Sequence, residues 1–153
     1  MQIVILAVGK LKERYFREAE AEYKKRLQAF ASLFLEEVTD QPGGQTARVK
    51  VTEGTRLLDR IKDRDVVIAL DAKGKKFTSE AFAEHLDGLF ASGASRYVLV
   101  IGGSHGLDER VLARADLLLS FSDFTFPHQL MRVILLEQLY RAFQIMRGGP
   151  YHK

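Results

Sequence analysis

The sequence has no cysteine, only three prolines and only four histidines among its 153 residues. Without cysteine the chain can form neither a disulfide nor a thiolate metal site, which fits a reducing compartment. The histidines are scattered, with no His-x-x-x-His spacing and no paired carboxylates, so we expect no metal site. No apolar run is long enough to span a bilayer and no signal-peptide pattern is present, so we expect a cytoplasmic protein with no membrane segment.

A large charge excess of either sign is also missing, because 23 Lys and Arg residues face 20 Asp and Glu residues, a net charge of +3. This mild basic excess is compatible with a polyanionic partner but does not require one. Apolar residues make up 46% of the chain, as in ordinary soluble globular proteins. The length, with no internal repeat or linker, indicates one domain over residues 1–153.

Segments with strand and helix patterns alternate along the chain. Apolar, mostly β-branched runs indicate strands at residues 2–8, 33–39, 65–71, 97–101 and 117–126. Amphipathic patterns indicate helices at residues 13–30, 46–62, 78–93, 108–115 and 127–146. The alternation predicts an α/β fold with a mainly parallel sheet and helices on both faces.

Three local features refine this prediction. Residues 71–76 have the composition of a basic turn, and Thr78 is a candidate N-cap for the helix after it. Pro127 suits the first turn of the last helix. That helix should pack through six apolar or aromatic side chains: Leu130, Val133, Ile134, Leu136, Tyr140 and Phe143. So large an apolar helix on so small a domain also suggests a dimer interface.

A glycine-rich loop, Gly102-Gly103-Ser104-His105-Gly106, follows the strand at residues 97–101. Glycines allow a sharp turn and a close approach of backbone amides to a ligand. The loop is neither a Walker sequence nor a GxGxxG motif, so a tight turn without a ligand remains equally compatible with it.

A second candidate segment, residues 121–128, alternates aromatic with small polar residues and ends in Pro127-His128. Such a loop could wrap a flat heterocycle, and it could equally be a strand that contributes three phenylalanines to the core. Both candidate segments follow apolar strands and precede helices. They should therefore meet at the carboxyl edge of the sheet, where α/β folds bind ligands.

Charged residues in the last helix and in the tail form a third group. Glu137 and Arg141 are four residues apart and can pair on one helix face. The terminal Tyr151-His152-Lys153 follows Gly-Gly-Pro and has the composition of a frayed end, yet an aromatic ring, an imidazole and a cation could also bind nucleic acid.

These motifs together resemble the ribosomal RNA large subunit methyltransferase H family, a small SPOUT-class group. The resemblance spans nearly the whole chain. It is carried by Leu70-Asp71-x-x-Gly74-Lys75, by the glycine loop, by Pro127-His128-x-x-x-Arg132 with the helix that follows, and by Pro150-Tyr151-His152. It implies a C-terminal trefoil knot, a homodimer and S-adenosylmethionine as methyl donor. It further implies N3 methylation of a pseudouridine in 23S rRNA on the assembled ribosome.

By match to the family, ten residues are expected to surround the cofactor: Leu70, Gly102, Gly103, Gly106, Phe121, Ser122, Asp123, Phe124, Thr125 and Phe126. Removing the imide proton before methyl transfer calls for a base or a cation nearby. We therefore take His128, Arg132 and His152 as candidate catalytic residues. Arg141, Tyr151 and Lys153 are candidate RNA contacts.

Two other functions stay open on the sequence. A non-catalytic ribosome- or RNA-binding module of the same fold would bind ribosomes but not S-adenosylmethionine. A doubly wound enzyme could use another nucleotide at the glycine loop and would be stabilised by that nucleotide instead. Because a net charge of +3 is small for binding naked RNA, we expect protein-free rRNA to be a poor substrate.

Overall fold

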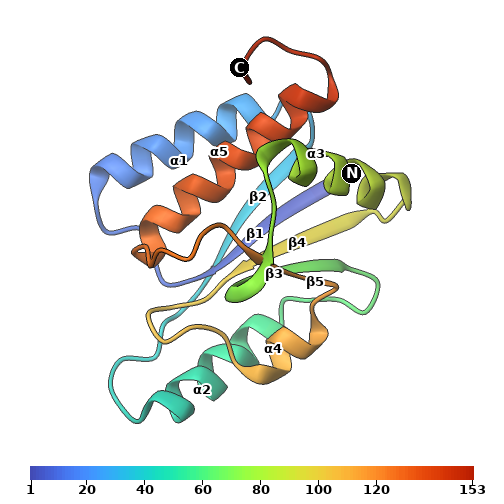
Figure 1. Ribbon diagram of the computed structural model, residues 1–153. Coiled ribbons are helices and arrows are strands. Elements are labelled where there is room, and N and C mark those ends of the chain that lie inside the picture. The colour runs from blue at the N-terminus through green and yellow to red at the C-terminus, as the bar shows by residue number, and fades with distance from the viewer.

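Five strands, all parallel, lie side by side in the order β2-β1-β4-β3-β5 in the computed structural model, which describes residues 1–153 (Figure 1). The strands are β1 (Gln2–Val8), β2 (Ser32–Val38), β3 (Val66–Lys76), β4 (Arg96–Ile101) and β5 (Leu117–Ser120). The helices are α1 (Arg14–Leu27), α2 (Thr46–Leu58), α3 (Ser79–Ala91), α4 (Glu109–Arg114) and α5 (His128–Met146). The predicted α/β class, with a parallel sheet, is confirmed.

Helices cover both faces of the sheet, as Figure 1 shows. One face packs against α1, α3 and α5 through residues such as Ile3, Leu86 and Leu136, and the other packs against α2 and α4 through residues such as Val4, Leu57 and Val111. The central strands are therefore buried on both sides, which explains their continuous apolar sequences. No helix is long and apolar enough to cross a membrane, and no cluster of three or more metal-ligating side chains is present.

The strand β3 is longer than its sequence suggested. It pairs with β5 up to Leu70, the register then shifts, and pairing resumes at Lys75, so the expected turn at residues 71–76 is a loop set into one strand. Gly74 permits this, because a Cβ there would lie 2.6 Å from the backbone carbon of Leu118. Conversely, β5 ends at Ser120, and residues 121–126 form a loop rather than the end of a strand.

The face that the last helix presents to the core matches the expected one only in part, because Leu136 and Phe143 are buried as predicted. Its buried residues are Arg132, Leu135, Leu136, Leu139, Ala142 and Phe143. The expected contacts Leu130, Val133 and Ile134 are only half-buried, and Tyr140 is half-buried but packs against the core. Apolar residues occur almost all round this helix, so periodicity does not single out one side of it. Pro127 stands at the N-cap, one residue before the expected first turn, whereas Thr78 caps α3 as expected by accepting a hydrogen bond from the Ala81 amide.

Candidate functional site

A cavity of about 380 Å³ opens at the carboxyl ends of β4 and β5, beside the loop inside β3. It lies within the range of about 300–1,000 Å³ that is usual for small-molecule sites. Its walls come from the loop inside β3, the glycine loop after β4, residues 119–126 at the end of β5 and beyond it, and the first turn of α5. The ligand site was predicted from the sequence at this same carboxyl edge of the sheet.

All ten residues expected around the cofactor line this one cavity, although they come from three separate segments: Leu70, Gly102, Gly103, Gly106, Phe121, Ser122, Asp123, Phe124, Thr125 and Phe126. His128 lines it too, as the only one of the three candidate catalytic residues to do so. The sequence reasoning missed Asp71 and Ala72, whose exposure here follows from the loop inside β3, and Met131, one turn into α5.

The glycine loop brings its backbone close to the cavity. The Gly106 amide donates to the Gly103 carbonyl at 3.1 Å, and Gly106 has a φ of 84°, a conformation that favours glycine. A Cβ at Gly102 would lie 2.9 Å from the carbonyl carbon of Gly106. The loop can fold this tightly only without side chains at these positions, and backbone groups consequently form this wall.

The loop at residues 121–126 combines the two alternatives that its sequence left open. Phe121 packs on the core, with its ring centroid 6.4 Å from that of Phe82, whereas Phe124 is 81% exposed at the cavity. The Phe124 amide donates to the Ser122 hydroxyl at 3.0 Å, and Asp123 pairs with Lys76 at the end of β3. The loop is therefore tied down at several points, and one aromatic ring is free to meet a ligand.

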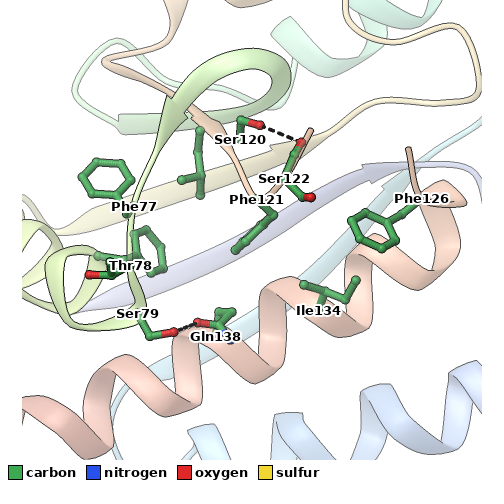
Figure 2. A pocket seen from close by; sticks show the side chains of 11 residues that line it. Phe77, Thr78, Ser79, Ser120, Phe121, Ser122, Phe126, Ile134 and Gln138 are labelled. Atoms are coloured by element: carbon green, nitrogen blue, oxygen red, sulfur yellow. Dashed lines mark hydrogen bonds between the residues drawn. The ribbon is translucent and has the colours of Figure 1, made fainter. Parts of the chain in front are cut away.

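A smaller hollow of about 210 Å³ lies on the other side of the same loop, between β5, the start of α3, and α5. Figure 2 shows the rings of Phe121 and Phe126 beside it and the hydrogen bond of 2.9 Å that the Ser79 hydroxyl donates to Gln138. This hydrogen bond joins α3 to α5, so the loop rests on two helices that are fixed to each other.

His128, the first residue of α5, is half-buried at the cavity wall. Burial, and after it the charge of Arg132, holds the pKa of His128 below its ordinary value of 6.5. The imidazole is therefore neutral at pH 7, and a neutral imidazole can accept a proton.

Arg132, the second candidate catalytic residue, lies under the surface and does not line the cavity. It is 3% exposed. Its guanidinium donates to Glu37 at 2.7 Å, to Glu20 at 3.3 Å and to the Gly9 carbonyl at 3.1 Å. Burial raises the pKa of Glu20 even though Arg132 opposes that rise. In this structure Arg132 ties the first turns of α5 to α1, to β2 and to the end of β1.

The tail is folded back rather than frayed. The Tyr151 hydroxyl donates to Glu137 at 3.1 Å, and His152 pairs with Glu80 of α3 at 2.7 Å. Burial, with hydrogen bonds to Tyr23 and Glu137, raises the pKa of Tyr151 to about 12. Arg141 donates to Glu137 at 2.5 Å, as its spacing suggested. Neither this cluster nor the exposed Lys153 lines the cavity.

A family model matches the chain over residues 1–152 of the 153. The matching family model is described as "Predicted SPOUT methyltransferase". The chain belongs to the SPOUT methyltransferase family. Members generally use S-adenosylmethionine as the methyl donor, and a methyltransferase activity is therefore supported for this chain.

The cavity fits such a donor. It has the volume of a small-molecule site, a wall of glycine backbone that can hydrogen-bond the polar edges of a ligand, and phenylalanines that can lie against a flat ring. The glycine loop and residues 121–126 would hold the donor in this SPOUT methyltransferase.

Proposed function

We propose that this SPOUT methyltransferase transfers a methyl group from S-adenosylmethionine to N3 of a pseudouridine in 23S rRNA. It would act in the cytoplasm, on the assembled ribosome. The observation that supports this best is the convergence of all ten expected cofactor residues, with His128 beside them, on one cavity. The family match supports the methyl transfer, and the resemblance of the motifs supports the nucleotide.

When bound, the methyl donor supplies an electrophilic methyl group on a sulfonium. The chain itself has to orient two reactants in line, and positioning contributes much of the rate of such a displacement. The tied-down loop at residues 121–126 and the glycine loop are suited to this because their conformations are held by internal hydrogen bonds.

The acceptor nitrogen has to lose a proton before or during attack. His128 is our candidate to take it, because it lies at the cavity wall and its lowered pKa keeps the ring neutral at pH 7. Arg132 would act through position, by fixing the helical turn that carries His128. His152, Arg141, Tyr151 and Lys153 are proposed to meet RNA rather than the methyl donor.

We also propose that the chain works as a homodimer and that its C-terminal part is knotted, as the resemblance implies. The half-buried face of α5, with Leu130, Val133 and Ile134, supports a dimer because a helix that is apolar all round is normally covered on all sides. Sedimentation equilibrium tests the dimer, and Ile134→Glu should yield monomers if this face is the interface.

Methyl transfer from labelled S-adenosylmethionine to ribosomes lacking the modification tests the function, with mass mapping of the 23S rRNA. We expect one methyl group on a pseudouridine and little transfer to protein-free rRNA. Binding of the methyl donor without transfer would point to another RNA. No binding of the methyl donor would favour a non-catalytic ribosome- or RNA-binding module.

A further inference from the structure

A second cavity, of about 290 Å³, lies at the carboxyl ends of β1 and β2 and borders the first. The two share the wall formed by Gly103, Ser104, His105 and His128. Along the sheet edge, one cavity therefore lies over β4, β5 and the loop inside β3 and the other over β1 and β2, with the glycine loop between them. A methyl acceptor in the second cavity would lie next to a methyl donor in the first.

A buried carboxylate with a free oxygen lines this second cavity. Glu53 of α2 is 4% exposed, and its Oε2 accepts a hydrogen bond from the Gln41 amide at 3.0 Å. Its Oε1 is buried and has no hydrogen-bond partner within the chain. A buried acceptor without a donor is costly, and native proteins rarely keep one unless it serves a purpose.

The glycine loop makes room for this carboxylate. A Cβ at Gly103 would lie 3.1 Å from Oε1 and 3.2 Å from Val8, distances tighter than nine in ten such contacts. The free oxygen therefore lies against the loop that separates the two cavities.

Two exposed lysines, Lys10 and Lys12, and one exposed carboxylate, Asp40, also line the cavity. The Lys12 amide donates to the Gln129 side chain at 3.0 Å, which ties the loop after β1 to the first turn of α5. A ligand that satisfies this lining offers a hydrogen-bond donor to the buried carboxylate and an anionic group to the lysines. A nucleotide whose base carries an N–H group has both.

We propose that the second cavity receives the acceptor nucleotide and that Glu53 Oε1 accepts a hydrogen bond from N1–H of pseudouridine. This inference rests on the proposed function. In uridine the sugar occupies N1, whereas in pseudouridine it is attached to carbon and N1 keeps its hydrogen. Only pseudouridine can therefore satisfy Glu53 and still present N3 for methylation. Glu53 becomes a residue that determines specificity, and His128, on the shared wall, stays beside the reacting nitrogen.

The experiment measures kcat/KM on assembled ribosomes reconstituted with 23S rRNA in which the target nucleotide is pseudouridine, uridine or N1-methylpseudouridine. For the wild-type protein we expect a loss of about 100-fold or more for both substitutes, because a site built to hydrogen-bond a group rejects analogues that lack it. Equal turnover of pseudouridine and N1-methylpseudouridine would overturn the proposal, and this measurement needs no variant to fold.

The matched variant is Glu53→Gln, whose amide oxygen can keep the Gln41 hydrogen bond and so place an NH₂ donor where the free oxygen was. We expect kcat/KM to fall about 10- to 100-fold on pseudouridine and to change little on uridine, so that selectivity collapses. Glu84→Gln makes the same chemical change at an exposed residue that lines neither cavity and should keep the selectivity.

A purely structural role for Glu53 would lower both rates equally and leave the selectivity ratio unchanged, which would refute the proposal. Binding of S-adenosylmethionine, measured by calorimetry, should stay within about twofold in Glu53→Gln, because Glu53 does not line the first cavity. If wild-type protein methylates none of the three substrates, the proposed function itself has failed, and that outcome is distinct from a lost preference.

Discussion

Replacing Arg132 by methionine would remove the cation that Glu20 and Glu37 share beneath the first turns of α5. Removing one partner of a buried ion pair typically costs about 3–5 kcal/mol, because the carboxylate left behind has no compensating charge. The Arg132 side chain is 4% exposed and that of Glu20 is 17% exposed, but that of Glu37 is 35% exposed and can reach water. We therefore expect the lower end, about 3 kcal/mol, or a decrease in Tm of about 6–12 °C.

The pH dependence of this loss gives a sharper test. The pKa of Glu20 already lies above its ordinary value, and removing Arg132 would take away a contact that lowers it. A carboxyl whose folded-state pKa is raised destabilises the fold above that pKa and is relieved as the pH falls through it. The deficit of Arg132→Met should therefore shrink between about pH 7.5 and about pH 5.

Urea unfolding followed by circular dichroism at both pH values measures this deficit, with Arg14→Met as the control. Arg14 pairs with Glu18 on α1 in an exposed salt bridge, whose loss should cost less than about 1 kcal/mol. A deficit for Arg132→Met that matches the control, or that is the same at both pH values, would refute the argument from a buried, uncompensated carboxylate. A variant that is fully stable yet inactive would instead point to a direct catalytic role for Arg132.

Three further outcomes are expected. Gly102→Ala should weaken S-adenosylmethionine binding at least about 10-fold by calorimetry, because its Cβ would lie 2.9 Å from the backbone of the glycine loop. Gly88→Ala, whose Cβ would contact nothing, should leave the affinity unchanged. Equal affinities for the two variants would count against a binding wall formed by the glycine loop. In an alkaline absorbance titration, Tyr151 should ionise near pH 12, and Tyr151→Phe should remove that late step. The hydrogen bond from His152 lowers the pKa of Glu80, so the contact between the tail and α3 should weaken only in acid, where Glu80 becomes protonated. In Glu80→Gln, hydrogen exchange should show the tail amides exposed at every pH.

Much of the fold could be predicted from the sequence, because a strand buried on both faces of a parallel sheet requires a continuous run of apolar residues. The β1 sequence is an example, since every residue after Gln2 is buried. The loop within β3 is different. Its composition reads as a turn, and only Gly74, which lets Leu118 approach closely, reveals that strand pairing resumes beyond it.

The sequence could predict those residues of the candidate site that are located by the end of a strand or by the spacing of a motif. The partners of a buried charge come from distant parts of the chain, so Arg132 could be recognised as special but not as bound to Glu20 and Glu37. The importance of Glu53 could have been predicted from its position in the sequence. It stands four residues after Val49 and four before Leu57, on the buried stripe of α2, where a carboxylate is out of place unless something pairs with it.

The strand order has a consequence for how the molecule is made. β4 is the fourth strand to leave the ribosome, yet it alone pairs with both β1 and β3. Until it emerges, the β1–β2 pair and β3 share no backbone hydrogen bond, and the nascent chain carries two incomplete apolar surfaces. The glycine loop follows β4 directly, so the wall between the two cavities can form only after both halves of the sheet have been joined, and neither half can assemble a partial site early in synthesis.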